Sequence, residues 1–77
     1  MRAILFVELD GSFPSAAEKV KHVSLGNCLQ LVAQFSANEL IVQVECDNPK
    51  SLNVAVNNDI AGIEGVKRII TCAVLSS

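Results

Sequence analysis

The stretch Ala3-Ile-Leu-Phe-Val-Glu-Leu9 (AILFVEL) alternates like a β-strand, yet it is apolar on both of its faces. Every second residue from Ala3 to Leu9 falls on one face, while Ile4 and Phe6 share the other face with Glu8. An antiparallel strand with one face in water should instead alternate apolar and polar side chains. The stretch therefore predicts a strand whose two faces are both shielded from water by other parts of the structure or by a partner.

The last part of the chain, Val66 to Leu75 (VKRIITCAVL), repeats this character. It predicts a second strand that is apolar on both faces, because side chains of a strand alternate with a period of two residues. Counting by twos divides it into two facing sets: Ile70, Cys72 and Val74 against Ile69, Thr71, Ala73 and Leu75.

Two further alternating runs lie in the middle of the chain, from Cys28 to Phe35 and from Glu39 to Cys46. The short polar break Ser36-Ala37-Asn38 between them indicates a β-hairpin. These strands look more conventional, because they contain regularly spaced polar residues. The expected polar positions are Gln30, Gln34, Gln43 and Glu45.

Two helices are expected between the strands. Pro14 suits a first helical turn, and a helix is predicted from Ser15 to about Val23. Asn48 can cap a second helix that begins at Pro49, because a side-chain oxygen at this position accepts from a free backbone N–H. Its apolar stripe has helical spacing and comprises Leu52, Val56, Ile60 and Ile63.

The predicted order is β-α-β-β-α-β in one domain over residues 1–77. Right-handed crossovers then place the first and third strands in the centre and both helices on one face. The sequence therefore predicts an α+β fold, the ferredoxin-like plait, with a four-stranded antiparallel sheet.

In this plait the first and last strands are neighbours, so their apolar residues should form a patch on the helix-free side of the sheet. A large exposed apolar patch marks an association surface, and symmetric dimers are the commonest outcome. An alternative is that C-terminal residues or a bent strand cover the patch. The expected dimer interface comprises Ile4, Phe6, Ile70, Cys72 and Val74.

Composition narrows the function classes. The net charge is −2 and the six basic residues are scattered, which argues against direct binding of nucleic acid. No apolar run approaches the roughly 18 residues that span a membrane, and the start lacks the layout of a signal peptide. Cys28, Cys46 and Cys72 are odd in number and widely spaced, so we expect buried free thiols in a cytoplasmic protein.

Catalytic patterns are missing from the sequence. His22 is the single histidine and shows no carboxylate, cysteine or serine partner at a recognisable spacing. The loop Asp10-Gly11-Ser12-Phe13 lacks the arginine of acylphosphatases and the cysteine pair of metal-carrying plaits. The acidic residues and glycines form no metal-ligand or phosphate-binding pattern. We therefore expect neither an enzyme nor a cofactor or metal site.

The predicted hairpin loop offers one set of groups for a ligand. Ser36-Ala37-Asn38-Glu39 contains a hydroxyl, an amide, a carboxylate and turn backbone groups. Exposed N–H groups could take the carboxylate of a small zwitterion, and Glu39 its ammonium group. The alternative is that these four residues only build the turn.

The second half of the chain resembles the ligand-binding domain of Lrp/AsnC-type transcription regulators. The likeness covers roughly residues 36–76 and rests on the run from Asn38 to Glu45, the Gly62-Ile-Glu-Gly-Val66 turn and the Thr71 strand. It implies a cytoplasmic domain that dimerises through its sheet, assembles further and binds amino acids between dimers. Carried over by position, the implied ligand residues are Asn38 and Glu39, followed by Thr71, and the loop chemistry adds Ser36 and Ala37 to the predicted site.

In the full regulators a DNA-binding domain precedes this one. The chain is too short for both, so the resemblance implies a stand-alone version that binds an effector or joins full-length regulators in mixed assemblies. The same features are also similar to the small assembly chaperones of periplasmic nitrate reductase. Those proteins hold a twin-arginine signal peptide against the sheet, and an acidic chain would suit such a peptide.

Overall fold

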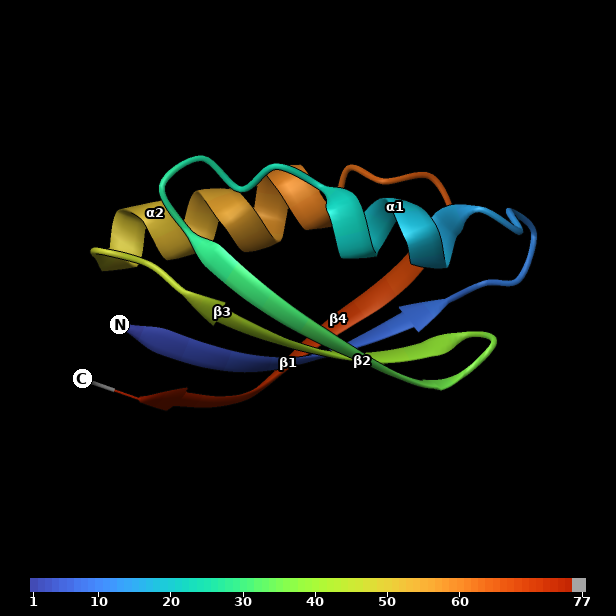
Figure 1. Ribbon diagram of the computed structural model, residues 1–77, viewed down its shortest axis with the longest axis horizontal. Coiled ribbons are helices and arrows are strands. Elements are labelled where there is room, and N and C mark those ends of the chain that lie inside the picture. The colour runs from blue at the N-terminus through green and yellow to red at the C-terminus, as the bar shows by residue number, and fades with distance from the viewer. Residues whose placement is uncertain (76–77) are drawn as a thin grey trace.

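The computed structural model describes residues 1–75, and within them strands and helices follow one another in the predicted order β-α-β-β-α-β (Figure 1). The elements are β1 (Arg2–Leu9), α1 (Ala16–His22), β2 (Leu29–Ser36), β3 (Glu39–Glu45), α2 (Pro49–Val54), its π-helical continuation η1 (Ala55–Ile60) and β4 (Val66–Leu75).

The strands form one antiparallel sheet in the order β2-β3-β1-β4. The first and third strands are central and β4 lies beside β1, as expected from the sequence. Both helical segments lie over the same face of the sheet, and no element of the described chain covers the other face (Figure 1). The predicted α+β class with a four-stranded antiparallel sheet is therefore confirmed.

The core lies between the helices and the two central strands. Alternate residues of β1 point into it, which explains why Leu5 and Val7 are fully buried. Burying such a side chain is worth about 1.5–3 kcal/mol. The other fully buried large side chains are Val20, Leu40, Val42, Val44 and Ile60.

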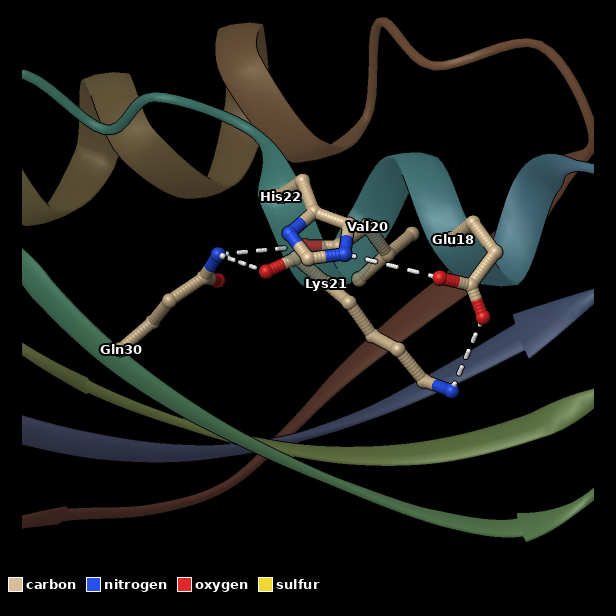
Figure 2. Close-up of polar contacts among 5 residues, drawn as sticks. All are labelled: Glu18, Val20, Lys21, His22 and Gln30. Carbon is tan, nitrogen blue, oxygen red and sulfur yellow. Dashed lines mark hydrogen bonds and ion pairs between the residues drawn. The ribbon is translucent and has the colours of Figure 1, made fainter.

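The short helix α1 is attached to the sheet by Gln30 of β2 (Figure 2). The Gln30 Nε2 group donates to the carbonyls of Val20, Lys21 and Val23 at 3.2, 3.3 and 3.3 Å. The last carbonyls of a helix have no partner within the helix. One side chain of the sheet therefore caps the end of α1.

The second helix begins as its sequence predicts. The Asn48 side chain accepts a hydrogen bond from the Ser51 N–H at 2.8 Å, and Pro49 occupies the first helical position. Of the predicted stripe, Leu52 and Ile60 are buried, while Val56 and Ile63 pack partly buried against the core. The chain leaves η1 through Gly65, whose φ of +99° is a conformation that suits glycine.

The prediction of three free, buried thiols is wrong. Cys28 and Cys46 form a disulfide, with their Cα atoms 4.4 Å apart, and Cys72 is free and exposed. The cysteines each lie one position beyond the Leu29↔Glu45 pair, so the bond closes the open end of the β2–β3 hairpin. Their separation of 18 residues matches no sequence motif, whereas the hairpin register places them side by side.

The disulfide should contribute measurably to stability. Replacing both Cys28 and Cys46 by alanine should lower the free energy of unfolding by roughly 3 kcal/mol, the effect expected for a closed loop of this size. Denaturant titration would measure the change, with Cys72→Ala as the neutral control. Three reactive thiols in the unreduced, unfolded protein would contradict the pairing.

Loss of the Gln30 cap should also be visible. Gln30→Ala leaves helix carbonyls without their donor and should cost about 1 kcal/mol of unfolding free energy. Gln34→Ala is the matched control on the same strand, because its amide donates only to the exposed Ser36 carbonyl. Equal stability of the two variants would show that the cap is unimportant.

Candidate functional site

The candidate site is the helix-free face of the sheet, which we call the open face. Directly paired residues of neighbouring strands share a face, and the helix side is fixed by buried Ala3, Leu5 and Val7. The strand registers then place the following residues on the open face: Leu29, Leu31 and Ala33 of β2, Ile41, Gln43 and Glu45 of β3, Arg2, Ile4, Phe6 and Glu8 of β1, and Arg68, Ile70, Ala73 and Leu75 of β4.

The middle of the open face is apolar across all four strands. One row across the sheet runs Ala33, Ile41, Phe6 and Ile70, and the next runs Leu31, Gln43, Ile4 and Ala73. Leu29 and Leu31 are each 72% exposed, and Ile70 is 43% exposed. Apart from Gln43, these side chains are apolar and neighbour one another across the sheet.

Charged residues frame the apolar middle at both ends. Arg2 Nη2 lies 3.8 Å from Glu45 Oε1 at one end, and Arg68 Nη2 lies 3.1 Å from Glu8 Oε1 at the other. Glu39 stands directly opposite Glu8 on the neighbouring strand. Exposed ion pairs of this kind add little to stability, so their main effect is to give each end both signs of charge.

The predicted interface set is only partly brought together. Ile4, Phe6 and Ile70 do share the open face. Val74 pairs with Ala3 and therefore lies on the helix-side register, so its assignment is wrong. The cause is a β-bulge: the register shifts between Ile4 and Leu5 and leaves Cys72 as the extra residue.

The reversal of the alternation at this bulge moves other residues onto the open face. Ala73 and Leu75, which the count by twos places on the other face, become the partners of Ile4 and Arg2. Leu75 is 46% exposed there. Counting by twos cannot reveal an extra residue in a strand, so this change of face was not predictable from the alternation alone.

The hairpin strands also differ from expectation. Gln43 and Glu45 lie on the open face, but Gln30 and Gln34 lie on the helix side of β2. From Leu29 to Ala33 the open positions of β2 are therefore all apolar. The apolar surface extends over the whole sheet instead of being centred on the first and last strands.

A hollow of about 370 Å³ lies beside this surface near the start of β2. It is lined by Leu29, Gln30, Leu31, Gln43 and Glu45. The hollow can accept an apolar side chain next to a carboxylate.

The hairpin loop predicted to hold a ligand satisfies its own polar groups. Ser36 Oγ donates to Glu39 Oε1 at 2.9 Å and accepts from the Asn38 N–H at 3.3 Å. The Asn38 carbonyl accepts from the Leu9 N–H at 2.8 Å, and Ala37 completes the turn. These bonds hold the turn itself together.

Thr71, the remaining predicted ligand residue, does not join this loop. It pairs with Leu5 and so belongs to the helix side of the sheet, whereas Glu39 lies on the open-face register. Thr71 lines a separate hollow of about 330 Å³ between η1 and β4, together with Asn57 and Lys67. Within one chain the predicted ligand residues therefore do not converge.

His22 has a carboxylate neighbour that was not expected from the sequence. Glu18, one helical turn earlier, places Oε2 at 3.5 Å from His22 Nε2 and Oε1 at 3.3 Å from Lys21 Nζ (Figure 2). The signal was the spacing of four residues within a helix. The imidazole is 77% exposed, so the pair is a surface contact on α1.

Side chains that could bind a metal ion do not cluster in the described residues. Among residues 1–75, no three His, Cys, Asp or Glu side chains lie close enough together to hold a metal ion. None of the helices in this range is both long and apolar enough to cross a membrane.

Comparison of the chain with protein-family models, with curated proteins and with solved structures finds no match in any of the three. The open face must therefore be interpreted from its own residues and geometry.

Proposed function

We propose that this chain is an assembly domain whose open face packs against the open face of a second copy. The observation that carries the proposal is the uncovered apolar surface that crosses all four strands between two charged ends. Large exposed apolar patches on soluble proteins are association surfaces. Face-to-face packing of two sheets is a common way to bury them.

A second copy matches this face in charge as well as in polarity. Each end carries one ion pair, Arg2 with Glu45 and Arg68 with Glu8. Whichever ends meet across a two-fold axis, a cation on one copy can therefore face an anion on the other. The apolar middle rows then meet each other, which is the self-complementarity that a two-fold interface requires.

The energies favour such a pair. Leu29, Leu31 and Ile70 are well exposed in the single chain. Burying a large aliphatic side chain contributes about 1.5–3 kcal/mol, and every such residue counts on both copies. Association costs on the order of 4–15 kcal/mol in lost freedom of motion. A few of these side chains on each copy offset that cost.

The proposal extends to the ferredoxin-like plait and to the Lrp/AsnC-like role of an effector domain. The strand order β2-β3-β1-β4 and the helices on one face support the plait. An amino acid would then bind between copies, with Asn38 and Glu39 as its partners, since Glu39 lies on the open-face register beside Glu8. Full-length regulators of the same type are the further partners this role suggests.

A signal-peptide chaperone is the second candidate. The open face carries the carboxylates of Glu8, Glu39 and Glu45 against two arginines, which suits an apolar peptide with basic residues. A cytoplasmic location fits both roles, but the Cys28–Cys46 disulfide removes the free-thiol argument for it, because disulfides persist mainly in oxidising compartments.

Breaking the apolar middle should break the assembly. Phe6→Glu places a charge in the centre of the open face, so the mass measured by native mass spectrometry should fall. Val54→Glu is the matched control, because Val54 is an exposed apolar residue (43%) on α2, away from the sheet. An unchanged mass for folded Phe6→Glu would exclude the open face as the interface.

The effector role has a separate test. If an amino acid binds between copies, one member of a thermal-shift panel of the twenty amino acids should raise the melting temperature. A ligand at 100 times its Kd adds about 2.7 kcal/mol of stability, and Glu39→Gln should abolish the shift. A flat panel would leave the assembly proposal intact and remove the effector. Binding of a twin-arginine peptide by a monomer would favour the chaperone instead.

A further inference from the structure

The two edges of the sheet differ in how far they are protected against pairing. On β4, register shifts leave Lys67 and Cys72 as extra residues, and the basic pair Lys67 and Arg68 directly follows the first residue of the strand, Val66. Bulges and charges of this kind prevent another strand from adding to an edge. The β4 edge is therefore blocked.

The β2 edge has neither bulges nor charges over most of its length. Its register is regular from Leu29 to Gln34, and the one irregularity is the extra residue Phe35 near the hairpin turn. No charged residue or proline lies between positions 29 and 36. A long, uncharged and regular edge strand is open to pairing with another strand.

The hydrogen bonds of β3 show which groups β2 leaves unpaired. Cys46 and Met1 exchange both backbone hydrogen bonds, at 2.8 and 2.9 Å, so the N–H and C=O of Cys46 point toward β1. Groups of alternate residues point the same way, so the groups of Glu45, Gln43 and Ile41 point toward β2. Their partners on β2 are Leu29, Leu31 and Ala33.

The backbone groups of the intervening residues Gln30, Val32 and Gln34 therefore point away from the sheet. They form a regular row of donors and acceptors along the free edge. The row faces the side on which β2 has no neighbour in the described chain.

We propose that this edge pairs antiparallel with the β2 edge of a second copy. With Val32 opposite its own counterpart, Gln30 of one copy faces Gln34 of the other, and both rows of free backbone groups are matched. On the open face the same register sets Leu31 against Ala33, a large side chain against a small one. Because β2 contains no charged residue, no charge repulsion opposes the approach of the two edges.

This interface is distinct from the open-face contact and adds to it. Edge pairing continues the sheet, so its two-fold axis stands perpendicular to the sheet, whereas face-to-face packing has its axis within the plane. Two perpendicular two-fold axes that meet generate a closed tetramer. The expected assembly is two extended sheets packed by their open faces, with all helices outside.

Gln34→Pro tests the edge directly, because it removes one outward N–H and leaves the bonds between β2 and β3 in place. Gln34→Ala is the matched control, since it loses the same side chain but keeps the N–H. Native mass spectrometry should show a tetramer for the unmodified chain and Gln34→Ala, and a dimer for Gln34→Pro. Circular dichroism checks that each variant is folded.

Amide hydrogen exchange of the unmodified chain gives an answer even if the proline variant unfolds. The Val32 and Gln34 amides should be protected at high protein concentration and exchange at least tenfold faster on dilution to the monomer. Fast exchange of these amides at all concentrations would overturn the edge proposal. So would a folded Gln34→Pro that keeps the mass of the unmodified chain.

The two proposals fail in different ways. A dimer that Phe6→Glu converts to a monomer, with Gln34→Pro unchanged, keeps the open-face contact and overturns edge pairing. A dimer that only Gln34→Pro dissociates supports the edge and overturns the open-face contact.

Discussion

The central strand β1 is apolar on both faces, and the helices of one small chain can cover only one of them. Leu5 and Val7 are buried on the face of the sheet that the helices cover, while Ile4 and Phe6 belong to the face that no element of the described chain covers. A chain of 77 residues buries only about 60% of the surface of its unfolded form. The association that we propose would cover the remaining apolar surface.

The rest of the structure holds β2 in position to extend that surface. This strand has a single neighbour in the sheet, β3, and therefore depends on other contacts. The Cys28–Cys46 disulfide closes one end of the hairpin, and at the same end the Gln30 amide joins the start of β2 to α1. The strand that carries Leu29 and Leu31 is therefore held in place by the disulfide and by the Gln30 hydrogen bonds as well as by its pairing with β3.

Much of the fold follows from sequence patterns because those patterns are local. The alternation in β1 and β3, the Asn48 cap and the buried Leu52 and Ile60 each depend on neighbours within a few positions. The predicted helix from residue 15 to 23 is likewise found over Ala16–His22.

The misses involve long-range register. The extra residue Cys72 exchanges the faces of Val74 and Leu75, and nothing local in the sequence announces it. The disulfide depends on pairing across the hairpin, and the same pairing places Gln30 on the helix side, where its amide reaches the end of α1. Candidate ligand residues on the hairpin loop and at Thr71 prove to lie on different faces, because the sheet register and not their order in the chain decides their direction.

Sedimentation equilibrium of the unmodified chain over a range of micromolar concentrations distinguishes an assembly from a solitary chain. We expect a mass that is a multiple of 8.2 kDa and that decreases only on dilution. A mass of 8.2 kDa at every concentration would contradict it, because the open face would then remain exposed to water in a stable, solitary chain.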